Sequence, residues 1–240
     1  MKSRAWRLNR FVASSLGISR RSADKLIKDE GVLINGTLSK NSGTRVSPEI
    51  DTVKYRNRVL ELPPVKYFIM NKPAGYLCSR RSQGGKSTVY DLLPESARKL
   101  ESAGRLDLGS TGLLLFTNDG ILAQKLTHPG FGHEKEYIVE VKYDPKINEA
   151  IKKLNLPVKL SDGYIAKASV NLKGKKGENF LLSMTLKTGH KRQVRMMCKK
   201  AGLRILSLTR VRIGRLNLPA GLLPGKGRFI SKEEAYKATG

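Results

Sequence analysis

One carboxylate in this basic chain stands out because of the residues around it. Asp107 follows Arg105 in a glycine-flanked segment, residues 104–109, and the apolar run 113–116 comes soon afterwards. An ionised carboxylate can act as a nucleophile or as a general base, and a neighbouring cation favours its charged form. An aspartate beside glycine is also a common turn residue that only caps the local backbone. The segment alone leaves a reactive and a structural interpretation of Asp107 open.

Two further segments carry side chains that could assist such a carboxylate. Residues 136–143 alternate between apolar and polar types, which predicts a β-strand that carries Tyr137. Residues 191–201 place apolar side chains on one helical face, and Arg192 and Arg195 on another. A tyrosine on a strand usually belongs to a core, and a charged helix face is usually solvated. The patterns alone therefore assign these residues no function.

The composition indicates a polyanionic partner. The 240 residues include 46 Lys and Arg against 20 Asp and Glu, which gives a formal net charge of +26. Each cation placed near a phosphate releases condensed counterions and gains affinity for nucleic acid. A membrane-surface protein would need a basic amphipathic helix with a large apolar face, and none stands out. No apolar stretch approaches the roughly 18 residues that a membrane span requires.

The cysteines and histidines do not suggest a metal site. Cys78 and Cys198 lie far apart, and neither is part of a Cys-x-x-Cys motif. His128 and His133 have no third ligand near them in the sequence, so we expect no metal. Residues 1–7 are charged rather than apolar, and nothing points to an oxidising compartment. We therefore expect a cytoplasmic protein without a signal peptide.

The front of the chain predicts a small module of two helices and a hairpin. Helical spacing of apolar residues predicts a helix over residues 7–15, and Ser19 suits the N-cap of a second helix that extends to Asp29. Asn35 and Gly36 lie between apolar-rich runs and signal a hairpin, because both turn residues must tolerate a positive φ. The candidate contacts to a polyanion in this module are basic: Arg7, Arg10, Arg20, Arg21, Lys25 and Lys28.

Residues 48–64 predict a stiff connector after this module. Pro48 begins the segment, Pro63 and Pro64 end it, and residues 53–56 predict a short charged strand between them. Prolines restrict the backbone, so we expect a rigid link rather than a flexible tether. The expected domains are residues 1–62 and residues 63–240.

The second domain predicts a mixture of strands and helices. Aromatic and β-branched residues predict strands over residues 65–71, 180–186 and 206–216, in addition to 136–143. Lys72 and Pro73 interrupt the first of these strands. This pattern indicates an α+β domain but not the order of its strands.

Taken together, these motifs resemble the ribosomal RNA pseudouridine synthases that carry an N-terminal S4 domain. The front module resembles the S4 domain in residues 7–11, 19–23 and 32–36. The rest of the resemblance spans nearly all of residues 65–232. The motifs that carry it there are residues 72–75, 104–120, 134–137, 189–197 and 224–229.

The resemblance implies a fold and an activity. It implies an S4-like domain followed by a synthase domain, with a mixed, mostly antiparallel sheet, flanking helices and a cleft across the sheet. It also implies site-specific isomerisation of uridine to pseudouridine in ribosomal RNA, by a monomer without cofactor or metal. Large-subunit (23S) RNA is favoured over small-subunit (16S) RNA. A non-catalytic RNA-binding or ribosome-assembly factor is the alternative, although a pure binder has no reason to keep all the catalytic motifs.

The resemblance also implies roles for individual residues. Asp107 is the catalytic residue, Arg195 pairs with it, and Tyr137 contacts the flipped base. Arg105 helps to extrude the uridine, which costs a few kcal/mol that backbone contacts must offset. Arg192 and the basic residues of the front module bind RNA. Whether the carboxylate attacks the sugar, attacks the base or removes a sugar proton stays open.

One position departs from the family pattern. His190 stands where the family usually has a small polar residue. We expect this change to alter contacts to RNA and not the chemistry.

Overall fold

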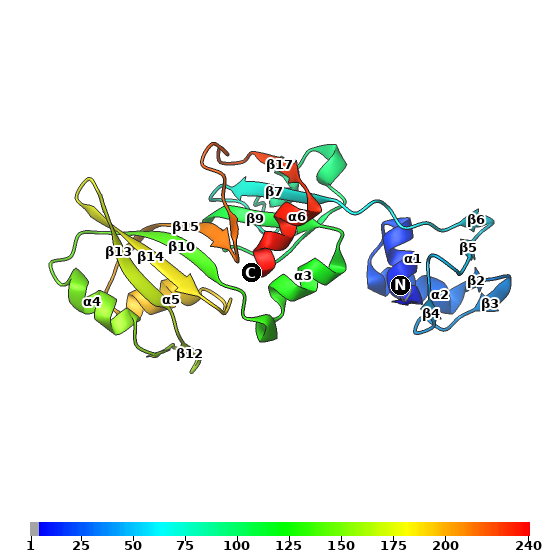
Figure 1. Cartoon of the computed structure of the whole chain (residues 1–240), viewed down its shortest axis with the longest axis horizontal. Helices are drawn as coiled ribbons and strands as arrows, with labels where there is room; N and C mark the ends of the chain where they lie inside the picture. Colours follow the sequence, from blue (N-terminus) through cyan, green and yellow to red (C-terminus); the bar gives the residue numbers. More distant parts are fainter. Residues whose placement is uncertain (1–4) are drawn as a thin grey trace. The chain divides into compact units, whose positions relative to one another are not determined.

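The computed structural model describes residues 5–240, which divide into two compact units between Val65 and Lys66 (Figure 1). Residues 1–4, most of the charged start discussed above, lie outside the described part of the chain. No helix within residues 5–240 is long and apolar enough to cross a membrane. Each unit is described by itself.

The two helices of the first unit form as the sequence predicts. Helix α1 (Leu8–Leu16) ends at Gly17, which adopts φ 68°, and α2 (Arg20–Asp29) begins after Ser19. The Ser19 hydroxyl accepts a hydrogen bond of 3.0 Å from the Ser22 N–H, so the predicted N-cap is confirmed. The apolar faces of both helices are buried, whereas their basic side chains are mostly at the surface. The exposed ones are Arg7, Arg20, Arg21, Lys25 and Lys28, and Arg10 lies over the Trp6 ring.

The hairpin prediction is also confirmed. Asn35 and Gly36, with φ of 50° and 86°, join β2 (Val32–Ile34) to β3 (Thr37–Ser39). These strands belong to a four-stranded sheet with the order β3-β2-β5-β6, in which β5 is Val53–Tyr55 and β6 is Arg58–Val59. Strand β1 (Trp6–Arg7) pairs separately with β4 (Arg45–Val46).

Residues 48–64 belong to the first unit and are not a connector, although the short charged strand expected within them forms. The segment contains β5 (Val53–Tyr55), which pairs with β2, and β6 (Arg58–Val59), which pairs with β5. The Asp51 carboxylate ties the start of the segment to the unit, since it accepts hydrogen bonds from the Asn35 amide and the Ser47 N–H. Proline content indicated stiffness here, but it carried no information about these long-range hydrogen bonds.

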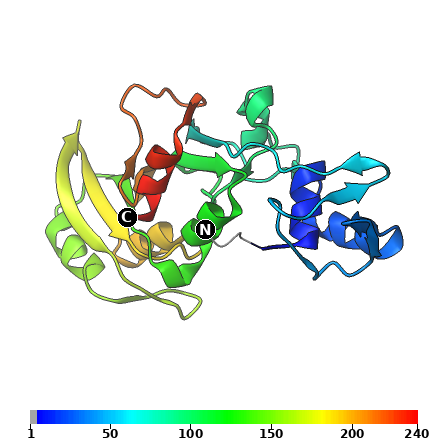
Figure 2. The same cartoon turned by 45° about the vertical axis from the view of Figure 1, so that its right-hand side comes forward.

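The second unit is built on a mixed sheet, which confirms the predicted fold class (Figures 1 and 2). Its strand order is β13-β14-β10-β15-β9-β7-β17, and every pair along this order is antiparallel except β15 with β9, which is parallel. The strands are β7 (Tyr67–Lys72), β9 (Thr111–Thr117), β10 (Lys135–Val141), β13 (Ser169–Lys176), β14 (Asn179–Leu186), β15 (Ile205–Ile213) and β17 (Gly227–Ile230).

Short strands and helices complete this unit. Strand β8 (Glu101–Ser102) pairs with β9, β16 (Leu216–Asn217) with β15, and β11 (Val158–Lys159) with β12 (Ile165–Ala166). The α-helices are α3 (Gly120–Thr127), α4 (Ile147–Leu154), α5 (Gln193–Lys200) and α6 (Lys232–Tyr236). The 3-10 helices are Val89–Leu92, Glu95–Ala97, Pro129–Phe131 and Lys237–Thr239.

Two strand predictions need correction. The strand expected over residues 136–143 ends at Val141, and Tyr143 is exposed and stacks on Phe180 instead. The strand expected over residues 206–216 ends at Ile213, and a further strand that was not predicted, β17, pairs with β7. The glycine-rich start of β17 gave little apolar periodicity from which to predict it.

Strands β7 and β9 are buried on both faces, which explains the uninterrupted apolar run 113–116. Leu113 and Leu115 face a cluster that includes Leu122 of α3. Leu114 and Phe116 face the opposite cluster. A strand that is covered on both faces has no need of polar alternation.

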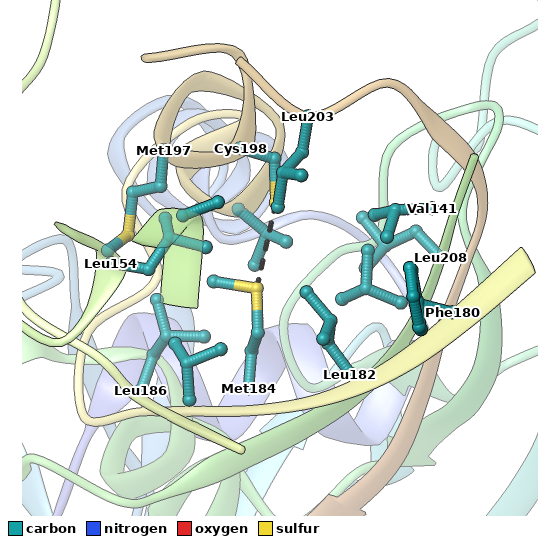
Figure 3. Packing of buried hydrophobic residues seen from close by; sticks show 14 of the residues in the cluster. Val141, Leu154, Phe180, Leu182, Met184, Leu186, Met197, Cys198, Leu203 and Leu208 are labelled. Atoms are coloured by element: carbon teal, nitrogen blue, oxygen red, sulfur yellow. Dashed lines mark hydrogen bonds between the residues drawn. The ribbon is translucent and has the colours of Figure 1, made fainter. Parts of the chain in front are cut away.

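A separate hydrophobic core packs helix α5 against the sheet (Figure 3). Cys198 of α5 is fully buried, and its thiol donates to the Met184 sulfur at 3.7 Å. Burial raises the pKa of the Cys198 thiol to about 12, so this thiol packs as an apolar group. The labelled members of this core are Val141, Leu154, Phe180, Leu182, Met184, Leu186, Met197, Cys198, Leu203 and Leu208.

Gly112 permits the parallel contact between β9 and β15. It adopts φ +104°, and an added Cβ would overlap the backbone of Arg210. We expect Gly112→Ala to lower the free energy of unfolding by about 3 kcal/mol or more, because a backbone clash cannot be relieved by a side-chain rotation. Urea unfolding measures this loss. Gly221→Ala is the control, since its Cβ would meet open space; equal stability of the two variants would contradict the prediction.

Candidate active site

A cleft of about 760 Å³ lies where β9 and β15 run parallel. Its walls come from the segment before β9, the start of β10, the loop before α5, and the turn between β11 and β12. Five of the residues predicted to act on RNA line it together, although they come from segments far apart in the sequence. These are Arg105, Asp107, Tyr137, Arg192 and Arg195.

A buried lysine holds the loop that carries Asp107, residues 107–110. Lys72 is fully buried, and its Nζ lies 2.8 Å from the carbonyl oxygen of Ser110 and 3.2 Å from that of Asp107. The carbonyl oxygens of Pro73 and Leu108 lie at 3.0 and 3.3 Å. Burial lowers the pKa of Lys72, while the nearby Cys78 and Asp107 act in the opposite direction. The ammonium therefore stabilises the loop backbone and leaves the carboxylate of Asp107 to face the cleft.

Arg195 joins helix α5 to the same loop. Its Nη2 donates to the carbonyl oxygen of Gly109 at 2.8 Å and lies 3.2 Å from the Ser110 hydroxyl. Its Nε lies 4.0 Å from Oδ2 of Asp107, whose side chain is 34% exposed. The guanidinium thus fixes the loop through its backbone and places a positive charge beside the carboxylate.

Gln193 holds the loop that precedes α5. Its side chain is buried, and its Oε1 accepts hydrogen bonds of 3.0 Å from the Thr188 hydroxyl and from the His190 N–H. Arg192, just before the helix, adopts a left-handed φ of 55°. This turn leaves the Arg192 side chain exposed at the cleft.

Tyr137 lines the cleft from strand β10. The ring is half-buried and packs against the core that holds α5. The pairing of β10 with β15 shifts register between Glu136 and Tyr137. Glu136 makes separate contacts, since its carboxylate accepts hydrogen bonds from Ser183 and Arg212, and these bonds lower its pKa.

Two of the cleft cations that the sequence did not reveal, Arg210 and Lys135, are buried or partly buried. Arg210 is only 3% exposed, and its Nε donates to the carbonyl oxygen of Leu113 at 2.9 Å. Lys135 donates to the carbonyl oxygen of His133 at 3.1 Å, and burial together with the charge of Arg210 lowers the pKa of Lys135. A usable signal was present, because Arg210 occupies the same inward-facing register as Leu208 on β15.

The electrostatics of the cleft follow from the charged residues that line it. Among the described residues that line it, Asp107 is the only carboxylate. The basic residues that line it are Arg105, Lys135, Lys187, Lys191, Arg192, Arg195 and Arg210. Such a cleft attracts a polyanion and surrounds its single acid with positive charge. Within residues 5–240, no group of three or more His, Cys, Asp or Glu side chains is arranged to hold a metal ion.

Comparison with known proteins agrees with this geometry. The family model for RNA pseudouridylate synthase matches residues 66–200, and the S4 domain model matches residues 6–49. The ribosomal large subunit pseudouridine synthase B of Buchnera aphidicola is 36% identical, over 90% of this chain and 90% of its own length. The ribosomal small subunit pseudouridine synthase A of Escherichia coli is 32% identical, over 95% of this chain and 97% of its own.

A solved structure shares the same architecture. A crystal structure of a pseudouridylate synthase superposes with a TM-score of 0.64 at 29% identity, covering 97% of this chain and 99% of its own. The model match extends over more than half of the chain, and it includes the carboxylate, the tyrosine and the arginine that meet in the cleft. The chain therefore belongs to the RNA pseudouridylate synthase family.

Proposed function

We propose that this protein isomerises uridine to pseudouridine in ribosomal RNA and that Asp107 is its catalytic residue. The observation that carries the proposal is a single carboxylate in a strongly basic cleft, with the Arg195 guanidinium beside it. The relatives named above are ribosomal pseudouridine synthases, which supports ribosomal RNA as the substrate. A binding protein of the same fold would not require this acid among the cations of the cleft.

The reaction requires little more than these groups. The N1–C1′ bond breaks, the uracil turns, C5 bonds to C1′, C5 loses its proton, and N1 gains one. An ionised Asp107 can act on the sugar or the base as a nucleophile, or remove a sugar proton. Arg195 holds the loop in place and sets a positive charge beside the carboxylate. Tyr137 lies where its ring can contact the base and its hydroxyl can serve proton transfer.

The uridine must leave the RNA helix before it can reach Asp107 in the cleft. Arg105 is exposed at the cleft beside Asp107, so it can occupy the space that the extruded base vacates. Extrusion costs a few kcal/mol, which contacts to the RNA backbone must offset. We assign these contacts to Arg192 in the cleft and, in the front module, to Arg7, Arg10, Arg20, Arg21, Lys25 and Lys28.

The two parts of the chain then divide the work. We propose that residues 1–62 bind the RNA and that residues 63–240 catalyse the reaction. We also propose that the protein acts as a monomer in the cytoplasm. Every group that the mechanism uses belongs to one chain. Large-subunit RNA is the proposed target, because the large-subunit relative from Buchnera aphidicola is 36% identical and the small-subunit relative from Escherichia coli is 32% identical.

Mapping pseudouridines tests both the activity and the target. Ribosomal RNA from cells with and without the protein is compared at nucleotide resolution, and the purified protein is then added to RNA from the deficient cells. We expect one pseudouridine in 23S RNA to vanish in the deficient cells and to be restored by the protein. A missing site in 16S RNA would change the target, and an unchanged map together with inactive protein would refute the activity.

The basic side chains of α2 offer a test of whether the front module binds RNA. Arg21, Lys25 and Lys28 are exposed, and we expect their joint replacement by Gln to reduce the slope of log affinity against log salt by about 2 to 3, since three phosphate contacts are lost. RNA binding measured from low to high salt gives this slope. The control replaces Lys146, Lys152 and Lys153 near α4 by Gln, which removes the same charge. Equal slopes for both triple variants would contradict the assignment.

A further inference from the structure

We propose that His190, backed by Tyr164, forms a second base-binding subsite that stacks on a nucleobase next to the target uridine. The inference rests on the proposed function, because it places a neighbour of the reacting nucleotide. Both residues line the cleft that contains Asp107. Neither takes part in the chemistry assigned above.

The two rings form an ordered stack. Their centroids lie 4.3 Å apart, and their planes differ by 2°. Tyr164 packs against the core that holds α5, so one side of the stack is supported. The His190 side chain is 28% exposed. The histidine ring therefore presents the outer, flat surface of the stack to the cleft.

Hydrogen bonds hold the edge of the histidine ring and the main chain of both stacked residues. Nε2 of His190 lies 2.6 Å from Oδ2 of Asp162, and Oδ1 of Asp162 accepts the Tyr164 N–H at 3.2 Å. The main-chain N–H of His190 also donates to Oε1 of Gln193. Because the ring is already held in one orientation, a base that stacks on it need not order the side chain first.

A nucleobase is the ligand that matches this surface. Planar side chains, histidine among them, bind unstacked bases in single-stranded RNA, and the contact tolerates any base because every base has a π face. Extruding a uridine removes the base on which its neighbours stacked. Lys187 and Lys191 come from the same loop and line the same cleft, where they can meet the phosphates on either side of such a base.

Two substitutions at His190 separate stacking from packing. His190→Leu keeps a similar volume without a π face, whereas His190→Phe keeps the flat ring, and both lose the hydrogen bond to Asp162. The full-length variants are titrated against a fluorescent single-stranded RNA octamer that contains one uridine among adenosines. We expect His190→Leu to bind about tenfold more weakly and His190→Phe to bind within about twofold of the wild type.

Salt provides a second readout. The difference between Leu and Phe should be the same at low and high salt, because stacking releases no counterions. Equal affinity of the wild type and both variants would overturn the subsite. So would equal losses in both variants, which would assign the effect to the Asp162 hydrogen bond.

Pseudouridine formation on ribosomal RNA from deficient cells keeps this inference distinct from the proposed function. If the wild type forms pseudouridine but His190→Leu and His190→Phe bind alike, the subsite is refuted and the activity stands. If the wild type forms no pseudouridine but His190→Leu alone binds weakly, the proposed function is refuted and the stacking surface stands as an RNA contact.

Discussion

Asp107→Asn is expected to bind ribosomal RNA as tightly as the wild type and to form no pseudouridine. The amide has nearly the same shape as the carboxylate but lacks its charge, so it can act neither as a nucleophile nor as a base. We expect the single-turnover rate to fall by at least about 10⁴-fold, as when a nucleophile is removed from other enzymes. RNA affinity should remain, because the proposed RNA contacts come from other residues.

The structure explains why this substitution leaves the loop intact. Lys72 and Arg195 hold the loop through main-chain carbonyl oxygens and the Ser110 hydroxyl. The Asp107 carboxylate itself approaches Nε of Arg195 only at 4.0 Å. The fold of the loop therefore depends on the backbone of Asp107 and hardly on its charge.

Glu149→Gln provides a matched control. Glu149 is exposed on α4, and the substitution makes the same change in net charge at a distance from the cleft residues. We expect its rate and its RNA affinity to equal those of the wild type. If Asp107→Asn also modifies RNA at a normal rate, Asp107 is only a turn residue and the reaction depends on another group.

Local features of the fold could be predicted from neighbouring residues. Ser19 at a helix start and Asn35-Gly36 between apolar runs act through hydrogen bonds and φ angles only a few residues away, and the structure contains both as expected. The error at residues 48–64 has a different origin. The contacts of Asp51 and the pairing of β5 with β2 join residues far apart in the chain, which local composition does not encode.

The same distinction applies to the cleft. The motifs around Asp107, Tyr137 and Arg195 could be singled out because each is compact in sequence. Arg210 could not be placed in the cleft from the sequence, because its position depends on the parallel pairing of β15 with β9. This pairing brings the Arg210 guanidinium against the carbonyl oxygen of Leu113. A motif marks a chemical group, but only tertiary pairing shows which cations surround it.

Lys72→Met is expected to reduce both stability and activity. Methionine matches the length of the lysine stem, but its thioether cannot donate to the carbonyl oxygens that surround the Lys72 ammonium. Each buried acceptor left without a donor costs about 1–3 kcal/mol, so we expect the free energy of unfolding to fall by about 3 kcal/mol or more. Urea unfolding of Lys72→Met beside Lys99→Met, a substitution at an exposed lysine, measures the difference.

The activity of Lys72→Met reports on the position of Asp107. The loop carries the carboxylate, and a displacement of about 1 Å can cost roughly 100-fold in rate. We expect kcat to fall by about this factor while RNA affinity changes little, since Lys72 is fully buried and cannot touch RNA. Measurements well below the unfolding midpoint of the variant ensure that the loss of rate does not reflect unfolded protein. A variant that loses stability but keeps the wild-type kcat would show that Lys72 supports the fold without positioning the catalytic acid.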